Sequence, residues 1–343
     1  MTERLNITES EYRGLKLPSY SLLKRIDDSG PKALIFDKKL DSEAIDFGSL
    51  VDCRLLSPQE FDNKFFIDAT EKPTGQLLEL ADYVIANDGK YEQSNGDVMN
   101  ISELIRLRDT YILEYISLQL NLFGSIKDSD KRVAKFDTDL FWNYLAAKRD
   151  SIGKTVFTPD ILEESNDAVM VLKTHPNTAH LFSKSKNVED FDQLALVSNI
   201  NGVDVKILID KVRIDHENKT ITPYDLKTMD FRSQFFKSNF IKFKYYLQGS
   251  LYKEVLSNWI KEELQLGYAL EDFKFIVYSR PDKYPSIWNM GLDWHYKGLN
   301  GFENIYGDHE KGVYELLDDY VFYINNPEVR VDRKIAQNKL IEL

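Results

Sequence analysis

The segment from residue 206 to residue 252 constrains this chain most, because it places charged residues on two neighbouring strands. Two runs at its start, 205–209 and 212–214, are rich in β-branched residues that favour extended backbone. A polar stretch at 215–219 separates them from another β-branched run at 220–222, as expected of a turn. This pattern predicts two antiparallel strands joined by a short connection.

Three charged residues of this predicted hairpin suit one kind of chemistry. Asp225 and Lys227 are two apart on a strand, so both side chains lie on one face and that of Leu226 lies on the other. Carboxylates hold hard divalent cations, and such a cation makes a water nucleophilic near neutral pH. We predict that Asp210 and Asp225 bind Mg²⁺ or Mn²⁺ and that Asp210, Asp225 and Lys227 hydrolyse phosphodiester bonds. Lys227 either positions the water, stabilises the developing charge or acts as a base.

Residues 235–259 have a helical periodicity and are predicted to form one long helix. Gln248 and Tyr252 lie four apart on it and therefore share a face. We predict that both position the substrate. The alternative is that Tyr252 is a core aromatic residue and Gln248 a surface amide.

Basic residues near the start of this helix, and one after a predicted strand at 273–279, are candidate contacts to a nucleic-acid backbone. They are Arg232, Lys244 and Arg280. Aromatic residues and further lysines alternate with them: Phe231, Phe235, Phe236, Lys237, Phe240, Lys242, Phe243, Tyr245 and Tyr246. The alternative is an amphipathic helix whose aromatic side chains fill the core and whose lysines are solvated.

The order of these motifs resembles that of a known nuclease group. Asp210, then Asp225-Leu226-Lys227 behind Pro223, then Gln248-x-x-x-Tyr252 is similar to the PD-(D/E)XK superfamily, in its RecB-like branch with a QxxxY motif. Segments 17–31 and 47–61 resemble the amino-terminal helices of RecE-type phage and prophage exonucleases. The resemblance implies an α/β fold with a restriction-endonuclease-like core, in which helices flank a small mixed β-sheet, and a large helical insertion.

Two acidic positions depart from the family pattern. Asp52 stands where the family usually has a metal-binding histidine, and an aspartate there is a sensible third ligand for magnesium. The alternative is that Asp52 is an ordinary polar residue of its helix. The family also tends to have an acid on the preceding strand, where this chain has Gln193 with Glu189, Asp190 and Asp192 just upstream.

The chain is interpreted as one elaborated nuclease domain spanning 1–343. Its predicted parts are N-terminal core helices (1–70), a helical insertion (73–185), a catalytic sheet with the QxxxY helix (186–290) and a C-terminal helical segment (291–343). Helices are expected within these parts at 101–123, 136–149, 159–173 and 306–324. The insertion is expected either to line a substrate channel or to be a scaffold.

The composition limits the partners and the compartment. A formal net charge of -12 excludes a surface coated with positive charge, so contacts to phosphates must be local. The single cysteine, Cys53, excludes an intrachain disulfide and a cysteine-bound metal cluster. Neither a signal peptide nor an apolar run of membrane-spanning length is evident. We therefore expect a protein of the bacterial cytoplasm that has no membrane partner.

The resemblance implies a metal-dependent DNA exonuclease used by a phage or mobile element in recombination or DNA processing. Linear DNA is the implied partner, with a recombination or single-strand annealing protein as a further one, and a homo-oligomer fits as well as a monomer. Two alternatives stay open: an endonuclease or RNA-directed nuclease of the same fold, and a silent member that binds nucleic acid or protein. Retention of Asp210, Asp225 and Lys227 together disfavours silence.

Overall fold

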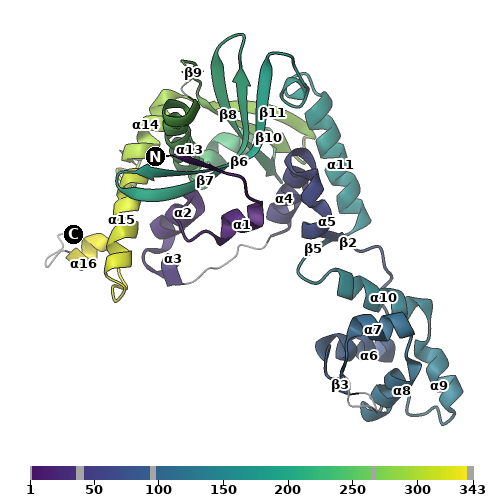
Figure 1. The fold of residues 1–343 in the computed structure, drawn as a ribbon. Helices are drawn as coiled ribbons and strands as arrows, with labels where there is room; N and C mark the ends of the chain where they lie inside the picture. Colours follow the sequence, from purple (N-terminus) through teal and green to yellow (C-terminus); the bar gives the residue numbers. More distant parts are fainter. Residues whose placement is uncertain (1, 36–41, 93–97, 265–266, 338–343) are drawn as a thin grey trace. The chain divides into compact units, whose positions relative to one another are not determined.

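The computed structural model describes residues 2–35, 42–92, 98–264 and 267–337 (Figure 1). The chain divides into two compact units. One comprises Met1–Pro58 with Ser165–Leu343, and the other comprises Gln59–Glu164. The first unit contains the residues predicted to carry function.

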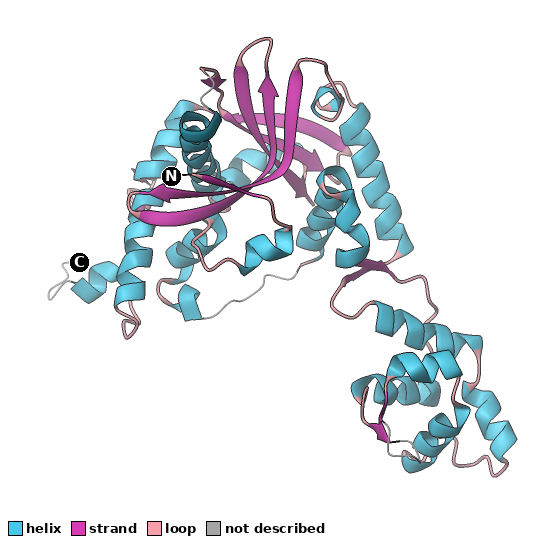
Figure 2. Ribbon diagram, viewed as in Figure 1, coloured by secondary structure: helices cyan, strands magenta, loops and turns pink. Residues whose placement is uncertain are grey.

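A mixed β-sheet forms the centre of the first unit (Figure 2). Its seven described strands are β1 (Glu3–Leu5), β6 (Val188–Ile200), β7 (Val203–Asp215), β8 (Thr220–Met229), β9 (Ala269–Leu270), β10 (Phe273–Ser279) and β11 (Tyr284–Met290). The order is β1-β6-β7-β8-β10-β11, with β9 also beside β8. Neighbouring strands run antiparallel, with two exceptions: β8 is parallel to β10 and to β9. The predicted mixed α/β architecture is therefore present.

Helices and short helical turns surround this sheet in the first unit. They are α1 (Glu9–Gly14), α2 (Tyr20–Ser29), α3 (Lys32–Ile35), α4 (Glu43–Leu56), η1 (Pro58–Glu60), η2 (Ala179–Leu181), η3 (Ser233–Phe235), α12 (Phe236–Lys242), α13 (Tyr245–Trp259), the π-helical turn η4 (Ile260–Leu264), α14 (Leu292–Asn300), α15 (Val313–Asn325) and α16 (Arg333–Gln337). A separate hairpin consists of β12 (Phe302–Glu303) and β13 (His309–Glu310). The unit boundaries fall within η1 and within α11 (Pro159–Thr174).

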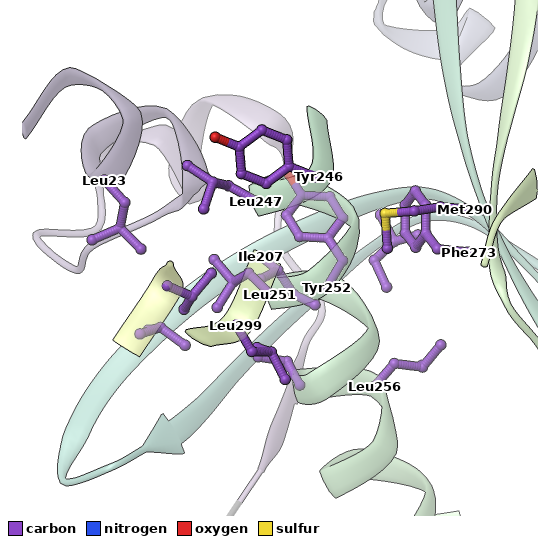
Figure 3. Close-up of a cluster of buried hydrophobic side chains, with 14 of the residues drawn as sticks. Leu23, Ile207, Tyr246, Leu247, Leu251, Tyr252, Leu256, Phe273, Met290 and Leu299 are labelled. Carbon is purple, nitrogen blue, oxygen red and sulfur yellow. The ribbon is translucent and has the colours of Figure 1, made fainter. Parts of the chain in front are cut away.

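Helix α13 supplies much of the hydrophobic core, because it packs against β6, β7 and β10. Figure 3 shows members of this core from α13 and from three strands: Leu247, Leu251, Ile207, Phe273 and Met290. Each of these side chains is almost completely buried. Removing this apolar surface from water is what holds the helix on the sheet.

The predicted hairpin is confirmed. Strands β7 and β8 are antiparallel, with Lys211 opposite Tyr224 and Asp215 opposite Thr220. The turn is stabilised by the Asp215 side chain, whose Oδ1 accepts the backbone amides of Glu217 and Asn218 at 2.9 Å. The strand predicted at 273–279 is also present, as β10.

The prediction of one helix over 235–259 is wrong, because α12 and α13 are separated at Phe243 and Lys244. Lys244 adopts a left-handed conformation with φ of +56°. Its ammonium contacts the carboxylates of Asp27 and Glu310, and the Tyr20 hydroxyl donates to the Phe243 carbonyl at 2.7 Å. These contacts come from distant parts of the chain and override the local helical periodicity.

The helix predicted at 306–324 is shorter than expected. Residues 309–310 belong to β13, and α15 begins only at Val313, after Gly312. The backbone amide of Gly312 donates to Glu315 at 3.0 Å, which fixes the start of the helix. The predicted range therefore included a short strand and a turn in addition to the helix.

The second unit is mainly helical. Its elements are α5 (Phe61–Lys64), β2 (Phe65–Ile67), α6 (Gly75–Ala86), β3 (Tyr91–Glu92), β4 (Val98–Met99), α7 (Ile101–Leu107), α8 (Thr110–Gln119), α9 (Ser129–Phe136), α10 (Asp139–Asp150) and β5 (Thr155–Phe157). The helix predicted at 101–123 is wrong in its continuity, because Arg108 has a φ of +46° and Asp109 starts a new helix by accepting two amides. Among the helices of the described ranges, none is both long and apolar enough to cross a membrane.

Candidate carboxylate and lysine site

Asp210 lies where β7 separates from both of its neighbours. Backbone pairing with β8 ends at Lys211 and Tyr224, one residue before Asp210 and Asp225 would face each other. Pairing with β6 skips Asp210 and Gln193 but continues on either side of them. The Asp210 carboxylate instead accepts the Leu226 amide at 2.8 Å and the Gln193 side-chain amide at 3.3 Å. A side chain thus replaces backbone partners at this position.

Asp225 is almost fully buried, at 2% exposure, although it carries a carboxylate. Its Oδ1 accepts the side-chain amide of Gln248 in α13 at 2.6 Å. Its Oδ2 forms an ion pair with the Lys227 ammonium at 2.5 Å. Two residues of the predicted site and one of the QxxxY helix therefore make direct contacts.

Lys227 extends from the same face of β8 as Asp225. Its ammonium lies 4.9 Å from the centre of the Tyr245 ring, within cation–π range. Burial opposes the charged form, but the nearby Asp225 and Tyr245, followed by Asp210, hold the pKa of Lys227 above its usual value. The ammonium form is thus favoured, which argues for an electrostatic role rather than a base.

Asp52 reaches the same region from α4, which packs on β8 and β7. The approach is close at Gly48, where an added Cβ would lie 2.8 Å from Thr228 Oγ1 of β8. Asp52 follows one helical turn later and so lies on the face of α4 that meets the sheet. Its Oδ1 is buried and has no hydrogen-bond partner within the described structure.

The three carboxyl groups influence one another's protonation. Burial, followed by the charge of Asp225, raises the pKa of Asp210 to about 8. Burial, followed by the charge of Asp210, raises the pKa of Asp52 well above its ordinary value. Burial also raises the pKa of Asp225, although Lys227 and Gln248 oppose the change. The protonated forms of these carboxyl groups are thus favoured, and the one nearby ammonium does not offset this effect.

Gln248 and Tyr252 do share a face of α13, but their surroundings differ. Gln248 is 5% exposed and contacts Asp225 directly. Tyr252 is 7% exposed and packs edge-on against Phe273, with ring centres 6.0 Å apart. Burial raises the pKa of Tyr252 well above its usual value, and the charges of Asp225 and Asp210 contribute. Tyr252 is therefore a core side chain at the edge of the site.

The residues that could replace the acid of the preceding strand have different surroundings in the structure. Gln193 lies at the site through its contact with Asp210. Asp190 and Asp192 instead pair with Lys211, at 3.5 and 2.8 Å. Glu189 lies 3.5 Å from the His216 side chain. An amide therefore stands where the family resemblance implies an acid.

The three predicted basic contacts lie in different surroundings. Arg232 is exposed and precedes η3. Lys244 pairs with Asp27 and with Glu310, the latter at 3.3 Å. Arg280 pairs with Asp230 at 2.7 Å and lies over the Phe47 ring at 4.0 Å. Their role as substrate contacts remains a prediction.

Sequence reasoning did not assign Tyr20 and Tyr245 to the site. Tyr245 was noted only as one of several aromatic residues, yet its ring contacts Lys227. The Tyr20 hydroxyl holds the backbone just before Tyr245. Burial raises the pKa of Tyr20, and the charge of Lys227 lowers it, which places Tyr20 near the site as well. The helical break at Lys244 turns Tyr245 towards β8, and no local sequence signal announces that break.

The donor set suits a hard divalent cation. Asp52 Oδ1 is an unpartnered buried oxygen, and the carboxylates of Asp210 and Asp225 share the charged cluster. Within the described ranges, however, no three His, Cys, Asp or Glu side chains form a ready-made metal-binding group. Both oxygens of Asp225 already contact Gln248 and Lys227, so a cation bound there would share or displace those contacts.

Comparisons with known proteins leave the family unassigned. No family model matches the chain, and no curated protein matches it. Among solved structures, the chain is similar to a crystal structure of a protein from Eubacterium rectale that is named provisionally as an exonuclease. The TM-score is 0.46 and the identity 12%, over 99% of this chain and 96% of that one. A similarity of this size assigns neither the fold nor the function.

Proposed function

We propose that the protein is a metal-dependent nuclease that hydrolyses phosphodiester bonds with Asp52, Asp210, Asp225 and Lys227. The observation that carries this proposal is the convergence of three carboxyl groups with raised pKa values, from α4, β7 and β8, around one ion-paired lysine. Buried groups with strongly shifted pKa values mark functional sites, because a fold gains no stability from concentrating like charges. The α/β scaffold holds these groups on rigid elements.

Each side chain has a defined task in this proposal. Asp52, Asp210 and Asp225 would hold Mg²⁺ or Mn²⁺, which supplies a water activated near neutral pH and offsets charge on the phosphate. The Lys227 ammonium would stabilise negative charge at the phosphate oxygens, since its ring contact and its ion pair fix its position. Gln248 would orient the Asp225 carboxylate through its hydrogen bond.

The finer assignment is a DNA exonuclease acting on linear DNA for a phage or mobile element. It is supported by the sequence resemblance to RecE-type enzymes and by the order of Asp210, Asp225, Lys227, Gln248 and Tyr252 along the chain. An endonuclease or an RNA-directed nuclease of the same fold would use the same hydrolytic residues as a DNA exonuclease. Separating these readings therefore requires a comparison of substrates rather than of site residues.

The direct test compares linear duplex DNA, linear single-stranded DNA, closed circular DNA and RNA, each with Mg²⁺, Mn²⁺ or EDTA. Asp225→Asn removes the charge with almost no change in shape, and Asp319→Asn is the matched control in another ion-paired region. We expect the parent protein to degrade linear DNA only when a divalent cation is present. Asp319→Asn should retain this activity, and Asp225→Asn should abolish it.

The other outcomes discriminate as clearly. Nicking of the circle would favour an endonuclease, and loss of RNA alone would favour an RNA-directed enzyme. Equal activity of Asp225→Asn and the parent protein would reject the site. No hydrolysis of any substrate with either cation would leave a protein that only binds its partner.

A further inference from the structure

A small group of aromatic and basic side chains lies beside Lys227 and has no part in the proposed hydrolysis. Phe243, which follows α12, is partly exposed, and its ring centre lies 5.7 Å from that of Tyr245. The ammonium groups of Lys24 and Lys242 lie 5.9 and 5.5 Å from the Phe243 ring centre. We call Phe243, Lys24 and Lys242 the aromatic step.

The structure separates this step from the aromatic residues that fill the core. Phe236, Phe240 and Tyr246 are 2%, 8% and 0% exposed and belong to the main hydrophobic cluster. Phe243 is only partly buried, and its ring neighbours include the Tyr245 ring and the ammonium groups of Lys24 and Lys242. The alternation of aromatic and basic residues in the sequence therefore has two structural meanings, one in the core and one at the surface.

The step is continuous with the candidate site through Tyr245. One neighbour of the Tyr245 ring is the Lys227 ammonium at 4.9 Å, and another is the Phe243 ring. Tyr245 also packs on the core residue Phe275, with ring centres 5.8 Å apart, which restrains its position. A ligand whose phosphate lies at Lys227 would therefore meet Phe243 next along this surface.

The backbone of the step is held in place before any ligand binds. The Phe243 amide donates to the Asn239 carbonyl at 2.8 Å, and its carbonyl accepts the Tyr20 hydroxyl at 2.7 Å. Lys244, the next residue, is fixed by Asp27 and Glu310. A rigid aromatic ring loses little conformational freedom on binding.

The charges at the step favour an anionic partner. Lys242 is exposed, and Lys24 faces Asp28 only at 3.8 Å, a loose pair between neighbouring turns of α2. The long distance and the partial exposure of both side chains make this pair weak, so Lys24 can turn to a phosphate at little cost. This local positive charge contrasts with the net charge of -12 of the whole chain.

We propose that the aromatic step binds an unpaired nucleotide adjacent to the scissile phosphate, with its base stacked on Phe243 and its backbone phosphates contacted by Lys24 and Lys242. An unpaired base presents a free face for stacking on a side chain, whereas both faces of a base inside a duplex are covered by its neighbours. The substrate strand at the site is therefore single-stranded, whether it is supplied as such or separated at a duplex end. This inference rests on the proposed nuclease function and adds the strand state of its substrate.

The test measures binding with the full chain in EDTA, where hydrolysis is off. A single-stranded oligonucleotide carries a fluorescent adenine analogue whose emission falls on stacking, and a blunt duplex of the same sequence is compared. Phe243→Ala is expected to weaken single-strand binding roughly tenfold to a hundredfold and to abolish the quenching, because each stacked base contributes that much. Phe243→Trp should retain both.

Matched controls lie in the same segment. Phe235→Ala removes another aromatic side chain, 48% exposed, that has no place in the step. Lys242→Gln should reduce the slope of log affinity against log salt by about 0.7, as expected for one phosphate contact to a single strand. Lys237→Gln removes an exposed lysine of the same helix, α12, and should leave the slope unchanged. Thermal melting of every variant excludes unfolding as the cause.

Each outcome has one meaning. Equal loss in Phe243→Ala and Phe235→Ala, or no loss in either, overturns the aromatic step. Hydrolysis by the parent protein together with unchanged binding by Phe243→Ala rejects the step but keeps the nuclease. Quenching that depends on Phe243, without hydrolysis under any cation, keeps the step and rejects the nuclease. Neither binding nor hydrolysis by the parent protein rejects both.

Discussion

Two regions of the first unit concentrate charge, and they do so in opposite ways. The C-terminal ion cluster consists of Lys311, Asp319, Asp332 and Arg333, which join α15 to the segment leading into α16. Lys311 contacts Asp319 at 2.8 Å and Asp332 at 3.1 Å, and Arg333 contacts Asp319 at 3.4 Å. Two cations thus face these two anions, and the exposed Asp318 lies 3.8 Å from Arg333.

The candidate site instead places three carboxyl groups near one ammonium. Burial raises the pKa of Asp210, Asp225 and Asp52 alike. In the C-terminal ion cluster the pKa of Asp332 is lowered, because the Lys334 amide and Lys311 outweigh the effect of burial. Paired charges offset one another when they are buried, whereas a buried group of like charges without such partners is expected where a ligand binds. The two regions therefore differ in the directions of their carboxyl pKa shifts, as expected if one is structural and the other is the proposed functional site.

The largest expected contrast is in hydrolysis. Asp225→Asn should lower the rate of DNA cleavage by roughly a hundredfold to a thousandfold, the loss typical of removing one preorganised electrostatic contact at a reacting centre. Asp319→Asn, in the C-terminal ion cluster, should leave the rate unchanged. Single-turnover cleavage of linear DNA with Mg²⁺ measures both, and a comparable loss in the two variants would break the comparison.

A smaller effect is expected at Gln248, which acts through Asp225. Gln248→Ala removes the donor to Asp225 Oδ1 and should reduce cation affinity or cleavage by roughly tenfold to a hundredfold. Raising the Mn²⁺ concentration should restore part of the rate, which a purely structural defect would not allow. Asn289→Ala, which removes an amide bonded to Asp272 at 3.1 Å elsewhere on the sheet, is the control.

The pH dependence of stability should distinguish the site as well. A carboxyl group whose folded pKa is raised stabilises the fold below its unfolded value near 3.8, and this contribution is lost as pH rises towards the folded value of about 8 for Asp210. The cation-free protein should therefore melt at a lower temperature at pH 8 than at pH 5. Asp210→Asn should flatten this profile, and Mg²⁺ should raise the melting temperature mainly at the higher pH. If the melting temperature of Asp210→Asn depended on pH as that of the parent protein does, the raised pKa of Asp210 would be contradicted.

The smallest expected effect comes from a substitution in the C-terminal ion cluster, which should change stability but not hydrolysis. Lys311→Met leaves the buried Asp319 with one cation fewer and should reduce the free energy of unfolding by about 2 kcal/mol, the range for a hydrogen bond to a charged group. Cleavage of DNA should be unaffected. Urea unfolding measures the change, and a gain in stability would show that the pair costs more in desolvation than it returns.

The sequence predicted the parts of the site that depend on local pattern. Alternation on β8 correctly placed Asp225 and Lys227 on one face, and the β-branched runs correctly predicted the hairpin. Helical spacing correctly put Gln248 and Tyr252 on one side of α13, but it did not separate the contact to Asp225 from the core packing of Tyr252.

The remaining features depend on contacts between distant residues. The break between α12 and α13 rests on Tyr20, Asp27 and Glu310, which no periodicity connects to Lys244. The contact of Tyr245 with Lys227 follows from that break. The basic residues predicted as substrate contacts were chosen by charge alone, and two of them, Lys244 and Arg280, have acidic partners of their own.

The separation of β7 from its neighbours at Asp210 gives the molecule a spectroscopic reporter of its own. The Leu226 amide is bonded to the Asp210 carboxylate at 2.8 Å. Its proton resonance therefore responds to whatever the carboxylate does, whether it gains a proton, binds a cation or turns away. Because this amide belongs to the backbone, it can follow the state of the site in the unmodified protein, with neither a substrate nor an attached label.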